Sequence, residues 1–129
     1  AFVKIGLVPD AGGSFLLPRL IGVAKAKELI FTGDNISAKE AKNIGLINYV
    51  TSDEEFNNEV NHWANKLKNG PLNAIGFAKK LINKGLESDL ETILEMEANY
   101  QGIVRQTKEH QEGLDAFLNK RSPDFIKKS

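Results

Sequence analysis

The stretch Ile5-Gly6-Leu7-Val8-Pro9-Asp10-Ala11-Gly12-Gly13-Ser14 decides how the rest of this chain is interpreted. An apolar run ends here at a proline and an aspartate, and two glycines follow closely. A short apolar run closed by Pro-Asp is typical of an extended segment that ends in a turn. The sequence therefore predicts that the Asp10 carboxylate lies on a turn, just before a helix.

Asp10 has two interpretations at this level. An aspartate beside glycine amides can move a proton at a substrate carbon, provided that it lies within hydrogen-bond reach of that proton. Aspartate is also a preferred N-cap residue, and local chemistry alone favours this capping role. The run 11–14 adds no further motif, because it lacks the Gly-Lys-Ser/Thr of a phosphate loop and the third glycine of a dinucleotide fingerprint.

Composition excludes several classes of protein. The 129 residues suit one domain, and 17 basic side chains balance 17 acidic ones, which argues against a nucleic-acid partner. The chain has no cysteine and two histidines, which leaves no basis for a thiolate or multi-histidine metal site. No apolar run approaches the roughly 20 residues that span a bilayer, and no signal peptide is evident. We expect a soluble, cytoplasmic protein with no metal and no membrane partner.

Most of the chain follows a helical pattern. Helices are predicted over about 11–22, 24–31, 38–45, 53–68, 71–84, 89–105 and 108–120. Their predicted caps include Ser37, Ser88 or Asp89, and Thr107, while Pro18 should kink or restart the first helix. In the helix 53–68 an apolar stripe is predicted to face a core; it comprises Phe56, Val60, Trp63, Ala64 and Leu67. Two short strands are predicted at 2–8 and 46–50.

An aromatic ring and several cations lie near the C-terminus: Phe117, Lys120, Arg121 and Lys127. One interpretation is a contact for a ligand that carries phosphate and a purine. The other places Phe117 in the core and leaves the lysines as solvated charges. The residues alone favour the second interpretation.

Six stretches follow one another in an order that resembles the enoyl-CoA hydratase/isomerase (crotonase) family. The first is 5–14, and the others are 17–22, 29–33, 36–41, 44–50 and 109–121. The resemblance covers essentially all 129 residues, but only the C-terminal half of the family's chain. It implies a mainly α fold, the helical C-terminal (trimerisation) region of a crotonase-like α/β fold with one or two short strands. Residues 1–22 would end the crotonase core and carry the catalytic turn, and residues 23–129 would form the helical assembly region.

The resemblance implies a catalytic role for Asp10. Hydratases of the family carry a glutamate where this chain has Phe2, and typically a glycine where it has Asp10. An aspartate at that position is similar to the family's isomerases, among them dienoyl-CoA isomerases and the ring-epoxide isomerase of phenylacetyl-CoA breakdown, which the run resembles most. A dehalogenase branch uses an aspartate nearby as a nucleophile. Asp10 thus matches the proton-transferring carboxylate.

The resemblance also implies the ligand and the assembly. Phe117 and Lys120 match the residues that contact the nucleotide end of CoA, often across a subunit interface. The expected substrate is an acyl-CoA, and no separate cofactor is expected because CoA is part of that substrate. The helical region packs the trimer in this family, so we expect a homotrimer or a hexamer.

We therefore expect the C-terminal part of an acyl-CoA isomerase that moves a proton and double bond, or opens a ring epoxide, through an enolate. Two backbone amides from the preceding half of the family's chain polarise the thioester carbonyl, so we expect the isolated 129-residue chain to be inactive. Two alternatives stay open. One is an enoyl-CoA hydratase with another carboxylate as base, against which Phe2 argues; the other is an inactive helical assembly fragment that lacks the oxyanion hole.

Overall fold

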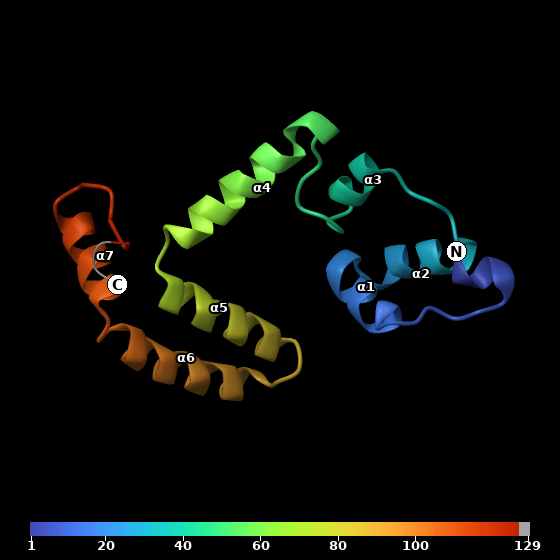
Figure 1. Ribbon diagram of the computed structural model, residues 1–129. Helices are drawn as coiled ribbons and strands as arrows, with labels where there is room; N and C mark the ends of the chain where they lie inside the picture. Colours follow the sequence, from blue (N-terminus) through green and yellow to red (C-terminus); the bar gives the residue numbers. More distant parts are fainter. Residues whose placement is uncertain (127–129) are drawn as a thin grey trace. The chain divides into compact units, whose positions relative to one another are not determined.

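The computed structural model describes residues 1–126 as helices joined by loops and turns (Figure 1). One short 3₁₀ helix, η1 (Phe2–Ile5), is followed by the α-helices α1 (Gly13–Ile21), α2 (Val23–Thr32), α3 (Ala38–Asn43), α4 (Asp53–Lys68), α5 (Leu72–Gly85), α6 (Leu90–Val104) and α7 (Lys108–Leu118). Residues 1–55 form one compact unit, and the chain from Phe56 onward forms a second. The predicted mainly α fold is confirmed.

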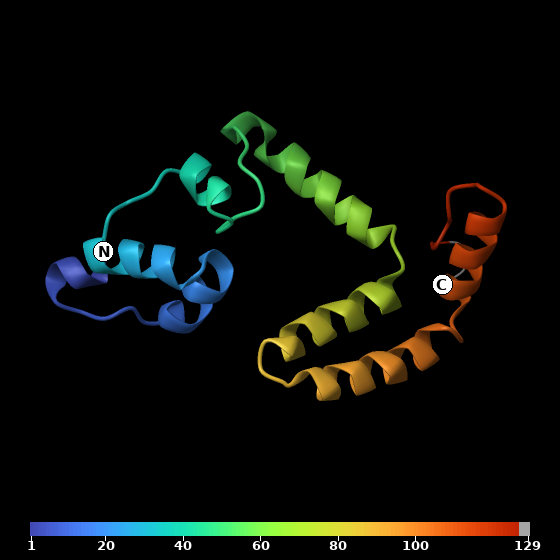
Figure 2. The ribbon, with the colours of Figure 1, turned by 180° about the vertical axis from the view of Figure 1, so that it is seen from behind.

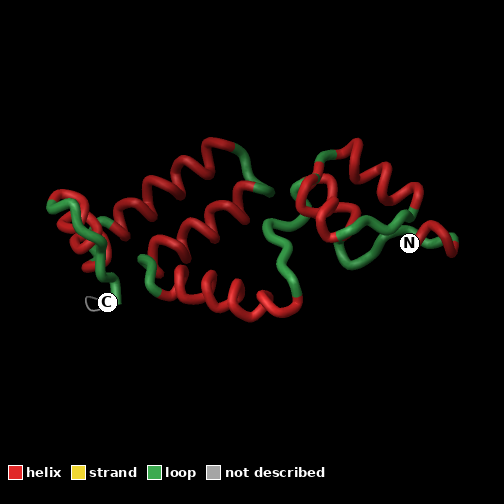
Figure 3. Tube along the Cα trace, turned by 90° about the horizontal axis from the view of Figure 1, so that it is seen from above, coloured by secondary structure: helices red, strands yellow, loops and turns green. Residues whose placement is uncertain are grey.

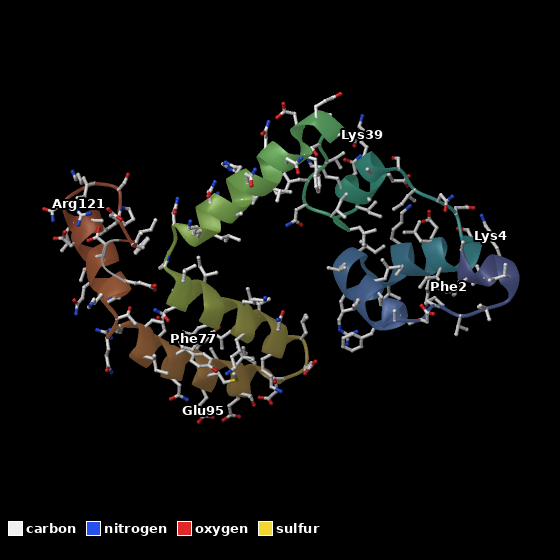
Figure 4. The ribbon with its side chains drawn as sticks, viewed as in Figure 1. Phe2, Lys4, Lys39, Phe77, Glu95 and Arg121 are labelled. Atoms are coloured by element: carbon white, nitrogen blue, oxygen red, sulfur yellow. The ribbon has the colours of Figure 1, made fainter. Side chains whose placement is uncertain are left out.

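The first unit is built around the packing of α1 against α2. The segment η1 lies against the C-terminal end of α2, where Gly33 is buried and a β-carbon would meet the side chains of Lys4 and Val3 at 3.1–3.2 Å. Lys4, labelled in Figure 4, also donates through Nζ to Asp34 Oδ1 at 3.3 Å. Since η1 and α1 are both packed on α2, the two ends of the loop between them are fixed.

In the second unit, α5 and α6 run side by side as a hairpin (Figure 2). The rings of Phe77 and Tyr100 stack between them, with centroids 4.5 Å apart. The start of α7 is tied to the start of α5, because the buried Glu109 carboxylate accepts the backbone N–H of Asn73 at 3.1 Å. A carboxylate in this position satisfies a helix-start amide that has no partner inside its own helix.

Several predicted helix starts are confirmed by cap hydrogen bonds. Ser37 Oγ accepts the N–H of Glu40 at 3.1 Å, Asp89 Oδ1 accepts that of Thr92 at 2.9 Å, and Thr107 Oγ1 accepts that of His110 at 3.2 Å. Pro18 lies inside α1 and does not end it. The predicted division at residue 22 stays a prediction.

The two predicted strands are wrong. The tube in Figure 3 contains helix and loop but no strand over residues 1–126. A strand must pair its N–H and C=O groups with a neighbouring strand, and no residue of 1–126 takes part in such a pair. The first segment instead makes local bonds, such as Leu7 N–H to Phe2 O at 3.0 Å. In the second, the N–H groups of Leu46 and Ile47 point back to the Ala41 carbonyl, at 2.9 and 3.4 Å.

The core is small. In the first unit the buried apolar side chains are Ala26 and Ala41, and in the second Ala116. The α4 stripe predicted to face a core is not buried by the described residues, since Phe56 is 58% and Leu67 48% exposed. No helix that the structure describes is long and apolar enough to cross a membrane.

Candidate functional site

Asp10 lies in the loop between η1 and α1, and it does not cap the helix. The N-cap of α1 is Gly12, whose carbonyl accepts the N–H groups of Phe15 and Leu16 at 3.0 and 2.9 Å. Asp10 contributes its backbone carbonyl, which accepts the Gly13 N–H at 2.8 Å. Its side chain is exposed and makes no hydrogen bond or ion pair with any residue of 1–126. The capping role that local chemistry favours is therefore wrong.

The backbone after Asp10 explains why the cap shifts. Ala11 (φ 48°) and Gly12 (φ 82°) are both left-handed. Two successive left-handed residues reverse the chain, so the helix begins at Gly13 instead of directly after Asp10. Glycine adopts this conformation freely, but an alanine does so at a cost of about 1–2 kcal/mol. The result is a tight turn that leaves the Asp10 carboxylate outside the helix cap.

An apolar hollow adjoins this turn. It has a volume of about 240 Å³ and lies within the first unit, with Phe2, Pro9, Leu17, Leu29 and Ile30 among its lining residues. Pro9 directly precedes Asp10, and Phe2 is the position at which the hydratase glutamate is expected. Asp10 itself does not line the hollow, but the residue before it does, and the mostly apolar lining, with Asp34 as its acidic member, suits an apolar group.

Phe117 and Lys120 lie together at the C-terminal end of α7, in the second unit. Phe117 is 80% exposed, so its predicted alternative as a core residue is wrong. The Lys120 N–H donates to the Phe117 carbonyl at 3.2 Å, and Lys120 adopts a left-handed backbone with φ 51°. The Lys120 ammonium makes no ion pair or hydrogen bond with the described residues. Lys127 lies outside the described residues.

An ion pair between the exposed Arg121 guanidinium and the buried Glu112 carboxylate holds this end of α7, and sequence reasoning missed its acidic member. Arg121 donates through Nη1 to Glu112 Oε1 at 2.5 Å and through Nη2 to Glu112 Oε2 at 3.1 Å. It also pairs with Asp115. These carboxylates, Glu112 above all, raise the pKa of the Arg121 guanidinium. The available signal was Glu112 four residues before the small apolar Ala116, a spacing that puts both on one helix face.

Among residues 1–126, no group of three or more histidine, aspartate and glutamate side chains is placed to hold a metal ion. Asp10 belongs to the first unit, and Phe117 and Lys120 belong to the second. The candidate groups are thus the Asp10 carboxylate on a strained turn, in the first unit, and the exposed Phe117 ring and Lys120 ammonium, in the second.

Comparison with known proteins gives matches over nearly the whole chain. The family model described as Enoyl-CoA hydratase/isomerase matches residues 1–128. The 1,2-epoxyphenylacetyl-CoA isomerase of Escherichia coli K12 is 39% identical over 128 residues, which cover 99% of this chain and 49% of that protein. The crotonyl-CoA hydratase of Syntrophomonas wolfei is 38% identical, over 98% of this chain and 48% of that protein.

Solved structures agree in fold. An enoyl-CoA hydratase from Bacillus anthracis superposes with a TM-score of 0.86 at 42% identity, over 94% of this chain and 47% of the other. An enoyl-CoA hydratase/isomerase from Cupriavidus metallidurans gives a TM-score of 0.89 at 35% identity, over 98% of this chain and 48% of the other. The chain spans about half the length of these relatives.

Proposed function

We propose, since this chain belongs to the enoyl-CoA hydratase/isomerase family, that the intact protein isomerises an enoyl-type CoA thioester with Asp10 as the proton carrier. One observation carries the proposal: the Asp10 carboxylate is exposed and is not used as the helix cap, which Gly12 provides. A carboxylate with no structural hydrogen bond to satisfy is available to a substrate.

The proposed step needs one base that takes the proton and hydrogen-bond donors that stabilise the negative charge of the enolate. Ionised Asp10 removes a proton from a substrate carbon, the electron pair moves into the thioester, and the carbonyl oxygen becomes an enolate oxygen. Asp10 then returns the proton to a different carbon, so that the double bond has moved and no atom is gained or lost. Donors to the enolate oxygen are needed, and we expect them from a part of the family's fold outside these residues.

Other features of the chain fit a CoA thioester. The apolar hollow beside Pro9 suits the acyl group. The exposed Phe117 ring and the Lys120 ammonium suit a purine face and a phosphate, because aromatic rings stack on bases and ammonium groups bind phosphate as point charges. We further propose a homotrimer or hexamer, in which the exposed apolar helix faces are covered. A ring-epoxide substrate is a narrower form of the same proposal, supported by the Escherichia coli relative.

A hydratase is the second candidate. It is favoured by the Syntrophomonas wolfei relative, which is nearly as similar and is named a hydratase. Hydration requires a group that activates water and a group that protonates carbon. At the position where the resemblance places one of the hydratase glutamates, this chain has Phe2, an aromatic ring that can do neither.

The test is the Asp10→Asn variant of the intact protein. The amide keeps the shape of the side chain but cannot carry a proton between carbons, so we expect isomerisation of an unsaturated or epoxide acyl-CoA to fall by about 10²–10⁴-fold. Circular dichroism should show an unchanged fold, because the side chain caps no helix. Asp53→Asn, an exposed aspartate of the first unit that does not line the hollow, is the matched control and should keep full activity.

Isotopes separate the two candidates. In D₂O the isomerase moves or exchanges carbon-bound hydrogen and forms no hydroxyacyl-CoA. In H₂¹⁸O a hydratase places labelled oxygen in its product. Full activity in the Asp10→Asn variant, or ¹⁸O incorporation as the main reaction of the wild type, would contradict the proposed isomerase.

A further inference from the structure

The buried carboxylate of Glu112 is the centre of a clasp at the end of α7. Its side chain is 1% exposed, and both of its oxygens bind the guanidinium of Arg121. One of them also accepts the backbone N–H of Asp124 at 2.8 Å. Burying a charge is unfavourable unless it is paired and hydrogen-bonded, and the fork of an arginine satisfies both carboxylate oxygens in one geometry. The clasp therefore fixes the backbone that lies between its two ends.

Phe117 and Lys120 lie inside the loop that this clasp closes. Arg121 N–H bonds to the Ala116 carbonyl at 3.0 Å, and Asn119 N–H bonds to the Asp115 carbonyl at 3.0 Å. The Arg121 guanidinium also donates to the Ser122 carbonyl at 3.2 Å. Figure 4 places the labelled Arg121 where the chain leaves α7 and turns back. The backbone on both sides of Phe117 and Lys120 is therefore held in place.

The clasp holds Lys120 in a conformation that a free chain would leave. Its backbone is left-handed. Glycine adopts this conformation easily and asparagine or aspartate occasionally, but it is unfavourable for other residues. The neighbouring residue is Arg121, whose side chain has three partners: Glu112, Asp115 and the Ser122 carbonyl. The Lys120 ammonium and the Phe117 ring take no part in the hydrogen bonds of the clasp, and both side chains are exposed.

We propose that Glu112 and Arg121 are positioning residues, which hold the Phe117 ring and the Lys120 ammonium ready for the nucleotide end of a CoA thioester. The inference rests on the proposed function. A positioning role differs from a purely structural role of the clasp in its effect on substrate binding. Preorganised contacts reduce the ordering cost of binding, so loosening the clasp weakens recognition of the nucleotide and leaves the acyl chemistry in the first unit unchanged.

The test compares two substrates of the intact protein: one acyl group as its CoA thioester, and the same acyl group as its pantetheine thioester, which lacks the nucleotide. Arg121→Lys keeps the charge but loses the bidentate fork. We expect it to raise KM for the CoA thioester about tenfold, with kcat unchanged and with both constants for the pantetheine thioester unchanged. Arg105→Lys, an exposed arginine at the end of α6, is the matched control and should change nothing.

A milder variant keeps the test decisive if Arg121→Lys does not fold. Asp115→Asn removes the charge of the exposed partner of the same guanidinium and should raise KM for the CoA thioester in the same direction, by a smaller factor. Inhibition by adenosine 3′,5′-bisphosphate, which carries the nucleotide alone, should weaken in parallel. Equal losses on both substrates, or no loss on either, would overturn the positioning role.

Lys120→Ala separates this inference from the proposed function. If Lys120→Ala loses the preference for the CoA thioester while Arg121→Lys keeps it, the contact is right and the positioning role is wrong. If the wild type itself shows no preference for the CoA thioester, the nucleotide contact and the positioning role both fail. Asp10→Asn activity tests the isomerase independently of either result.

Discussion

Two residues other than glycine have a left-handed backbone in the part of the chain that the structure describes, 1–126. They are Ala11, directly after Asp10, and Lys120, which is itself a candidate contact. A glycine at either position would relieve a cost of about 1–2 kcal/mol. Backbone strain of this kind clusters at active sites and ligand-binding sites. The two outliers therefore point to the same two places as the proposed chemistry, on grounds that do not depend on relatives.

Lys120→Gly gives opposite predictions for stability and for binding. A glycine adopts φ 51° without strain, so the free energy of unfolding should rise by about 1 kcal/mol. The same change removes the ammonium, so KM for an acyl-CoA should rise several-fold. Denaturant unfolding and steady-state kinetics of the intact protein measure the two quantities.

Lys120→Ala is the control for that experiment, because it keeps the β-carbon and with it the backbone strain, and removes the rest of the side chain with its ammonium. It should raise KM as Lys120→Gly does, without the gain in stability. A Lys120→Gly protein that is more stable and binds acyl-CoA as well as the wild type would show that Lys120 only ends the helix, at a cost in stability, and does not contact the ligand.

At the scale of single helices, the start of α6 has a measurable pH dependence. The hydrogen bonds from the Thr92 N–H and hydroxyl lower the pKa of Asp89 from its usual 3.8. A lowered pKa means that the ionised cap stabilises the helix fully above pH 3.8 and loses this effect as the pH falls through the lower, folded value. Carbon-13 titration of the Asp89 carboxyl should give a midpoint below 3.8.

Hydrogen exchange supplies the control for this cap. Protection of the amides in the first turn of α6 should fall at low pH in the wild type. It should stay level in Asp89→Asn, which keeps an acceptor oxygen and has no charge to lose. A wild-type midpoint at or above 3.8 would contradict the cap's role as an ionised acceptor.

These helices also show which parts of the fold the sequence could predict. The caps at Ser37, Asp89 and Thr107 were predictable because each depends on residues within three positions of it. The two strands were predicted wrongly, because a segment becomes a strand only beside a partner that its own residues do not specify. The Asp10 cap was predicted wrongly because the left-handed turn at Ala11 and Gly12 competes with it.

The candidate site divides in the same way. Asp10, Phe117 and Lys120 were identified through residue types at matching positions of a known family, and their exposure agrees with use by a ligand. The Glu112–Arg121 pair was not predictable as a pair. Its two members are nine residues apart, and only the turn that follows α7 brings them together.

At the scale of the whole molecule, the exposed apolar surface is the main feature of each unit. In the first, Ile5 is 74% and Phe31 69% exposed, and in the second, Leu90 is 73% and Leu118 69% exposed. Burying a large apolar side chain contributes about 1.5–3 kcal/mol. The buried apolar residues that the structure describes are three alanines, which gain little from burial. The helices therefore need further protein surface to cover them, as the proposed trimer or hexamer would supply.

The isolated 129-residue chain should accordingly behave unlike the intact protein. We expect helical circular dichroism, because the caps are local, but a broad unfolding transition and strong binding of the dye ANS, because apolar faces stay exposed. We also expect no isomerase activity and no micromolar binding of CoA, since the proposed oxyanion-hole donors and the covering protein surface are not among these residues. Urea unfolding, ANS fluorescence and calorimetry measure these properties, with the intact protein as control. A sharp transition with little ANS binding, or micromolar affinity for CoA, would show that this chain forms a complete core and nucleotide site by itself.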